Sequence, residues 1–290
     1  MALYRLETLF PVELQSRLDE RPILVLPFGT IEWHSHHLPL GLDGIVAEGL
    51  GERIAELSGA VLAPVSYWAA GGVPYPYTLN LPAQVIEPLL VAIFEQFAAM
   101  GFRVIVGFTG HFGLEQTLAL KRAALAVMGR SPVTILPLAE YDLTTDAGYT
   151  GDHAAVGETS LLWALRPDLV RLEAVPADQP LDGVLGVDPR GKAGPEQGRI
   201  WFEAIASRAA EVAGRLLAAT TPVERAAFIE ALAAGVRVLE KIAAQRQLLP
   251  KAAVPSITTP AYLACCQAIY RGDYRAAKTH AEKKLADLSA

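Results

Sequence analysis

Histidine and carboxylate side chains are crowded into one short stretch of the chain. Three of the six histidines lie within residues 32–43, together with Glu32 and Asp43. Imidazole and carboxylate ligands in one set suit borderline divalent ions such as zinc, manganese or iron. In an extended segment Glu32 and His34 would point the same way, and Asp43 could fold back beyond a turn and bridge two ions. The stretch therefore predicts a metal centre.

Two later loops contain the other candidates. His111 lies at the apex of a glycine-rich turn within residues 107–113, directly after an apolar run. Asp152, His153 and Glu158 come just before an expected helix. Carboxylates and imidazoles at loops of this kind serve in metal binding and in proton transfer. We expect His111 and Glu158 to bind metal, and His153, Glu158 and Asp152 to take part in catalysis.

Several of these residues also have a purely structural interpretation. Glu158 could complement a helix dipole, Asp152 could be a turn residue or a helix cap, and His36 could support its neighbours by hydrogen bonding. Polar groups at the ends of apolar strands need partners if they are buried. Metal binding is therefore favoured for Glu32, His34, Asp43 and His111.

The loops that carry these residues follow the elements of a layered α/β fold. Continuous apolar runs predict buried parallel strands, covered on both faces by helices, at residues 22–28, 60–65, 104–108 and 133–138. Helices are expected at residues 45–57, 84–100, 114–128 and 158–165. Ligands in open parallel sheets bind outside the carboxyl ends of the strands. The loops after Phe28 and Phe108 begin at that edge.

The last seventy or so residues differ in character. Thr221-Pro222-Val223-Glu224 has the residues of a capping box with proline at the first helical position, and an alanine-rich helix is expected to follow. Two further helix starts are predicted near Thr259 and Asp273. We therefore predict a hydrolase domain over residues 1–220 and a helical extension over residues 221–290, used for packing or oligomer contact.

Composition narrows the classes of function. The net charge is −6 and the chain has no long basic run, which argues against nucleic acid as a partner. Neither a signal sequence nor a charge-free membrane span is recognisable, so we expect a cytoplasmic protein that does not contact membranes. Cys265 and Cys266 are adjacent, where a mutual disulfide would be strained, and are predicted to be buried thiols.

The order of these motifs resembles the creatininase (creatinine amidohydrolase) family, which also includes formamide hydrolases of flavin and deazaflavin biosynthesis and peptide-trimming hydrolases. The resemblance covers about the first 220 residues, a span of domain size. It rests on Leu26-Pro27-Phe28-Gly29-Thr30-Ile31-Glu32-Trp33-His34, His37-Leu38-Pro39-Leu40-Gly41-Leu42-Asp43, Thr109-Gly110-His111, His153 and Glu158-Thr159-Ser160, with weaker support from Gly186-Val187-Asp188-Pro189-Arg190.

The resemblance implies a three-layer α/β/α domain with a mostly parallel sheet and a binuclear metal centre. It also implies a homo-oligomer, with a hexamer as one option. Carried over by motif, Glu32 and His111 would bind one ion, His34 would bind the other, and Asp43 would bridge the two. The implied activity is that of an amidohydrolase acting on carbon–nitrogen bonds other than peptide bonds.

The chain departs from the family pattern at several positions. Creatininase has a glutamate two positions after the histidine of the second loop, where this chain has Gly113. The second ion therefore needs another ligand, and Glu158 is the candidate. Thr109 replaces a common asparagine, and Val156 stands where a glutamate is usual. An aromatic loop at residues 67–77 replaces the usual pocket loop. The predicted substrate-pocket residues are Trp33, His36, Trp68 and Tyr75.

These features predict a metal-dependent amidohydrolase that cleaves an amide-type C–N bond, in a cyclic amide or a formamide, within a small polar substrate. Metal ions would activate a water for attack on the carbonyl. His153 would protonate the leaving nitrogen, with Asp152 fixing the tautomer of its ring. One alternative is a non-catalytic or single-metal binding or scaffold protein of the same fold. A phosphatase is disfavoured, because the motif loops contain no arginine or lysine to hold phosphate.

Overall fold

A computed structural model describes residues 2–175, 177–219, 221–248 and 259–288. Its sheet has the strand order β1-β3-β2-β4-β5, and every pairing in it is parallel. The strands are β1 (Tyr4–Arg5), β2 (Ile23–Phe28), β3 (Val61–Leu62), β4 (Val104–Thr109) and β5 (Thr134–Ala139). Phe28 pairs with Thr109, and Thr109 pairs with Ala139. The carboxyl ends of β2, β4 and β5 are therefore level, so the loops that follow them meet at one edge.

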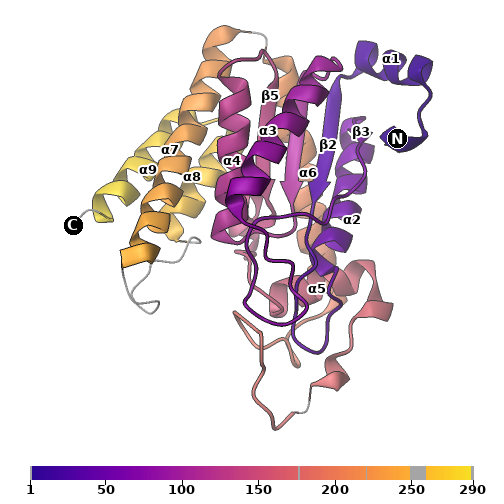
Figure 1. Ribbon diagram of the computed structural model, residues 1–290, viewed down its shortest axis with the longest axis vertical. Coiled ribbons are helices and arrows are strands. Elements are labelled where there is room, and N and C mark those ends of the chain that lie inside the picture. Colours follow the sequence, from indigo (N-terminus) through magenta and orange to yellow (C-terminus); the bar gives the residue numbers. More distant parts are fainter. Residues whose placement is uncertain (1, 176, 220, 249–258, 289–290) are drawn as a thin grey trace.

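Helices cover both faces of the sheet (Figure 1). Helices α3 (Ala83–Ala99) and α4 (Leu114–Met128) pack together on one face, while α2 (Leu42–Ser58) packs with α6 (Pro195–Ala218) on the other. All residues of β2, β4 and β5 are buried, because apolar side chains on both sides of the sheet meet a helical layer. The predicted three-layer α/β/α fold is confirmed.

Most elements match the prediction from sequence. Helix α4 has the expected bounds, and α5 (Val156–Leu165) begins two residues earlier than expected. The strand expected at 60–65 is wrong in length, because only Val61–Leu62 pairs with its neighbours. Helices α1 (Pro11–Glu20) and α6, and strand β1, were not predicted. Helix α1 has no buried residue, so the burial that marks the other helices of the domain is weak there.

The C-terminal residues form the expected helices, α7 (Pro222–Leu248), α8 (Pro260–Arg271) and α9 (Tyr274–Asp287). They lie beside α4, at the edge of the molecule coloured orange and yellow in Figure 1. Buried side chains of α7 and α8, such as Leu239 and Tyr262, belong to the same hydrophobic cluster as the sheet. The extension is thus part of a continuous core, although the division at residue 220 stays a prediction.

The thiols and the hydropathy of the helices agree with the sequence analysis. Cys265 and Cys266 are free and buried within α8. Across the described residues, no helix combines the length and the apolar character that crossing a bilayer requires.

Two glycines let the strand ends touch the first turn of α2. A Cβ atom on Gly29 would lie 2.2 Å from the backbone nitrogen of Gly44, and one on Gly110 would lie 2.2 Å from the carbonyl oxygen of Asp43. Real side chains cannot approach backbone so closely. The absence of side chains at these positions therefore allows Asp43 to sit at the carboxyl ends of β2 and β4.

We expect Gly110→Ala to lower the free energy of unfolding by about 1–3 kcal/mol, the usual cost of overpacking, and to weaken metal binding by displacing Asp43. Denaturant titration and zinc titration would measure the two effects. Gly194→Ala is the control, since a Cβ there meets no atom within 4 Å. Equal stability and zinc affinity in the two variants would contradict the close approach of Gly110 and Asp43.

Candidate metal centre

The first group of potential ligands lies where β2 and β4 end and α2 begins. The Nδ1 atom of His111 lies 2.9 Å from Oε2 of Glu32 and 3.2 Å from Oδ2 of Asp43. All three side chains are buried. One atom from each lies close enough to the others to hold a single ion. Glu32 and His111, which the sequence predicts as ligands of one ion, thus have the geometry of a metal site.

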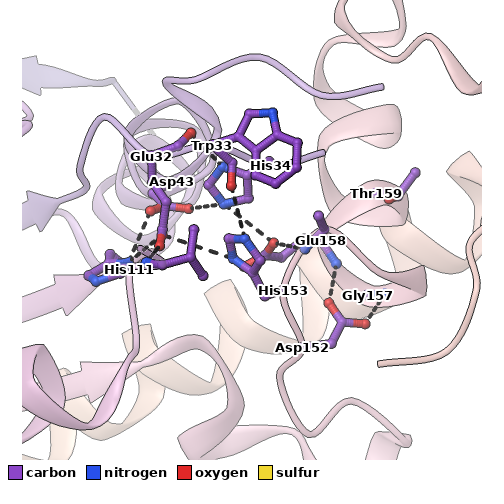
Figure 2. A network of polar contacts seen from close by, with 12 residues as sticks. Glu32, Trp33, His34, Asp43, His111, Asp152, His153, Gly157, Glu158 and Thr159 are labelled. Carbon is purple, nitrogen blue, oxygen red and sulfur yellow. Dashed lines mark hydrogen bonds and ion pairs between the residues drawn. The ribbon is translucent and has the colours of Figure 1, made fainter. Parts of the chain in front are cut away.

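The second group shares Asp43 with the first. The Nε2 atom of His34 lies 3.0 Å from Oδ1 of Asp43 and 3.5 Å from Oε2 of Glu158. Figure 2 shows the Asp43 carboxylate between the rings of His34 and His111. Each oxygen of Asp43 faces a different histidine, as a carboxylate that bridges two ions would. Glu158, the candidate for the ligand that Gly113 does not supply, belongs to this group.

Several polar atoms of this cluster are buried without a hydrogen bond. Both carboxylate oxygens of Asp43 and the Nε2 atom of His34 have no partner of acceptable geometry, although His34 and Asp43 are close. Buried polar atoms without partners are costly and rare in folded proteins. The lone pairs of these oxygen and nitrogen atoms converge on the same space. A divalent cation in that space would satisfy them better than they satisfy one another.

Charge pairing explains how the cluster is held together without ions. Burial alone would lower the pKa of His111, but the nearby carboxylates of Asp43 and Glu32 outweigh it and raise that pKa to about 10. Burial would raise the pKa of Asp43, yet the two histidines hold it well below its usual value. Protons on the histidines thus occupy the positions for which cations would compete.

His153 lies beside this cluster, with its ring centroid 4.4 Å from that of His34. Its Nε2 atom lies 3.0 Å from the carbonyl oxygen of Trp33. Because a carbonyl only accepts, Nε2 carries the proton of the neutral ring, and Nδ1 faces Glu32 at 4.0 Å. Burial, together with the charge of His34, lowers the pKa of His153 to about 4. The ring is therefore neutral at pH 7 and can accept a proton at Nδ1.

Asp152 does not have the predicted role of fixing the tautomer of His153. Its carboxylate accepts hydrogen bonds from the backbone nitrogens of Gly157 at 2.6 Å and Glu158 at 3.0 Å, so it caps the first turn of α5. Orphan amides at a helix start attract acids more strongly than a nearby imidazole does. The Trp33 carbonyl fixes the ring instead. Asp152 contributes indirectly, by fixing the turn that carries Glu158.

Comparisons with known proteins identify the family of the chain. The family model described as "Creatininase: Creatinine amidohydrolase" matches residues 8–213. The chain belongs to the creatininase family. Creatinine amidohydrolase of Pseudomonas putida is 29% identical over 194 residues, covering 58% of this chain and 75% of that protein. A mycofactocin precursor peptide peptidase of Mycolicibacterium smegmatis is 32% identical over 155 residues, covering 51% of this chain and 59% of that protein.

Solved structures show the same creatininase fold. A crystal structure of creatinine amidohydrolase superposes with a TM-score of 0.63 at 25% identity and covers 74% of this chain and 98% of that chain. A creatininase variant described as the Zn-Zn type superposes with a TM-score of 0.58 at 26% identity, covering 73% of this chain and 97% of that chain. The helices α7, α8 and α9 lie beyond the residues that the family model matches.

Three of the four predicted pocket residues of this creatininase-family chain lie together. Trp33 packs against Tyr75 with ring centroids 4.1 Å apart and the ring planes tilted by 52°, and it contacts His36 edge-on at 5.6 Å. Tyr75 donates a hydrogen bond from its hydroxyl to Asp182. Trp68 is 54% exposed, and the ring contacts within the described residues do not join it to this group. The aromatic surface is therefore centred on Trp33, between two potential ligands.

The sequence analysis missed how the aromatic loop is attached to the ligands. The backbone nitrogen of Val73 donates to Oε1 of Glu32 at 2.5 Å, and that of Trp33 donates to the Thr78 hydroxyl at 3.2 Å. Glu32 thus has one oxygen fixed by the loop and the other directed at His111. No sequence signal reports such a backbone contact, because it depends on the path of the loop in space.

A buried carboxyl group near the centre was also missed. Glu140 directly follows β5 and accepts a hydrogen bond from the Tyr149 hydroxyl at 2.6 Å. Burial raises its pKa to about 8, with Asp43 and Asp152 adding to the rise. Its position directly after an apolar strand, at the same sheet edge as His111, was a usable signal.

Proposed function

We propose that this creatininase-family chain is a metal-dependent amidohydrolase with two divalent ions. It would cleave an amide-type C–N bond other than a peptide bond, as in a cyclic amide or a formamide, in a small polar substrate. One observation carries the proposal: the two oxygens of Asp43 are buried, lack hydrogen bonds and face two different histidines. A carboxylate in this position is the natural bridge between two cations.

The ligand sets follow from the two groups around Asp43. Glu32, Asp43 and His111 would hold one ion, and His34, Asp43 and Glu158 would hold the other. Mixed imidazole and carboxylate sets suit zinc, manganese or iron. The solved relative described as the Zn-Zn type supports zinc as the first ion to test.

Divalent ions bound at this site would supply an activated water near neutral pH and polarise the carbonyl of the substrate. His153 would accept the proton of that water at Nδ1 and then donate it to the leaving nitrogen. The Trp33 carbonyl holds the ring in the tautomer that leaves Nδ1 free. Trp33 and Tyr75 would stack on a planar substrate and exclude water from the site.

We also propose that the chain works as a homo-oligomer in the cytoplasm, without nucleic acid or membrane as a partner. An exposed apolar face of α3 supports self-association, since Val85 is 57% and Leu89 is 42% exposed. Exposed apolar patches of this kind often mark interfaces.

The role of Glu158 separates the two-ion proposal from a single-ion scaffold. We expect Glu158→Gln to bind one ion per chain where the wild type binds two, and to lose at least about 100-fold in kcat/KM, because one ligand set loses a charged member. Metal analysis after gel filtration gives the stoichiometry, and a panel of formamides, cyclic amides and short peptides identifies the substrate. Glu173→Gln, on a short exposed helix, is the matched control. Two ions in Glu158→Gln, or one ion in the wild type, would contradict the proposal.

A further inference from the structure

Helix α8, which lies outside the residues that the family model matches, packs directly against the short helix η2 (Glu140–Leu143) after β5. We infer that α8 positions the loops that carry His111 and His153, so that the C-terminal extension is a required part of the metal centre. The inference rests on the proposed function. It concerns positioning, because no residue of α8 is among the potential ligands.

The first link is a buried ion pair beneath η2. Lys121 of α4 donates to Oδ2 of Asp142 at 2.6 Å, and both side chains are buried. The same oxygen accepts a hydrogen bond from the backbone nitrogen of Ala139. Cys266 of α8 is buried as well, and its pKa is raised by burial and by the charge of Asp142. Moving η2 would separate the two charges inside the protein, which is strongly unfavourable.

The second link is the ring of Tyr141, which touches both ligand loops. It packs edge-on against Phe112, the residue after His111, with ring centroids 5.5 Å apart. A Cβ atom at Gly151 would lie 2.8 Å from Cδ1 of Tyr141 and 3.1 Å from Cε2 of Phe112. Gly151 has a φ of +77° and comes two residues before His153. Tyr141 therefore packs against both loops.

The third link joins Tyr141 to the extension. Tyr262 of α8 is 1% exposed. It belongs to the same buried cluster as Tyr141, and burial raises its pKa well above the usual value. A large side chain of α8, the helix that packs against η2, thus lies in the core beside that segment. Removing it would leave a cavity there.

A fourth contact fixes the far end of the same segment. Asp146 forms ion pairs with Arg208 of α6 and, at 3.5 Å, with Arg271 at the end of α8. Arg208 also donates to the carbonyl of Leu143. The segment between β5 and His153 is therefore held at Asp142 and again at Asp146, with α8 contributing at both places.

The test compares two buried aromatic residues of the extension. Tyr262→Ala removes a buried ring from α8, the helix that packs against η2, whereas Phe228→Ala makes a cavity between α7 and α9, where Phe228 packs on Tyr274. Both variants should lower the Tm. Only Tyr262→Ala should raise the Kd for zinc, by at least about tenfold, and speed hydrogen exchange of backbone amides 139–153 in the metal-free protein. Tyr262→Phe, which keeps the ring, should restore both values.

If the alanine variants do not fold, Tyr262→Leu and Phe228→Leu provide the same comparison. The inference is overturned if the Tyr262 and Phe228 variants have the same zinc Kd and the same exchange rates over residues 139–153. A wild type that binds no zinc would refute the proposed function, while the exchange comparison in metal-free protein would still decide whether α8 holds these loops.

Discussion

Asp43→Asn is expected to lose both divalent ions and to reduce kcat/KM by at least about 1000-fold, because one residue serves both ligand sets and both ions stabilise developing charge. Asparagine keeps the shape of the side chain but removes its charge and one of the two acceptor oxygens. Metal analysis and steady-state kinetics on the best substrate of the panel measure the two losses. Asp168→Asn is the control, since Asp168 is exposed and pairs with Arg166.

The metal-free forms of these proteins should also differ in stability. The pKa of His111 is raised from 6.5 to about 10 by its carboxylate neighbours. The resulting stabilisation is therefore fully present below pH 6.5 and is lost as the pH rises toward 10. Asp43→Asn should show a smaller loss over this range. Retention of two ions by Asp43→Asn, or an equal pH dependence in chelated wild type and variant, would contradict the arrangement around Asp43.

His153→Asn is expected to lower kcat by about 10²- to 10⁴-fold, the usual contribution of a positioned acid–base group, while both ions stay bound. Its ring is outside the two ligand sets built on Asp43, while with Glu32 and His34 it forms a third group that could hold an ion, and its Nδ1 atom faces Glu32. Single-turnover kinetics and metal analysis on the same sample separate proton transfer from metal binding. A variant whose kcat lies within a factor of about three of the wild type would exclude this role.

Lowering the pH should reduce the contribution of His153 to the stability of the protein. Its pKa is lowered from 6.5 to about 4, so the stability that it contributes is fully present above pH 6.5 and is lost as the pH falls toward 4. His153→Asn should therefore lose less stability than the wild type between pH 7 and pH 4.5, as measured by denaturant titration. An equal loss in both proteins would show that burial of the neutral ring has no such effect.

The sequence predicted the sheet well, because its signals are local. The continuous apolar runs of β2, β4 and β5 reflect burial on both faces of the sheet. Every residue of these strands is buried, so each one is apolar or small enough to be recognised in the sequence. Strand β3 was overestimated because its regular pairing ends at Leu62, although Ser66 still forms an isolated bridge to Phe28 of β2. Helix α1 was missed because its contacts with the core are slight.

For the proposed metal centre, residue types identified the candidates, while only the fold showed how they are arranged. Glu32, His34, Asp43, His111 and Glu158 could be singled out because their chemistry and their positions at strand ends or a helix start are visible in the sequence. The role of Asp152 was wrong, because a backbone donor at the start of α5 competes for its carboxylate. The partner of His153 is a backbone carbonyl, and no side-chain pattern encodes such a partner.

The most direct test is X-ray diffraction from crystals of the zinc-loaded chain at the zinc absorption edge. Two anomalous peaks on either side of the Asp43 carboxylate, one beside His111 and one beside His34, would agree with the account. A single peak, or none within coordination distance of Asp43, would contradict it, because the unpaired oxygens of that residue would then need another explanation.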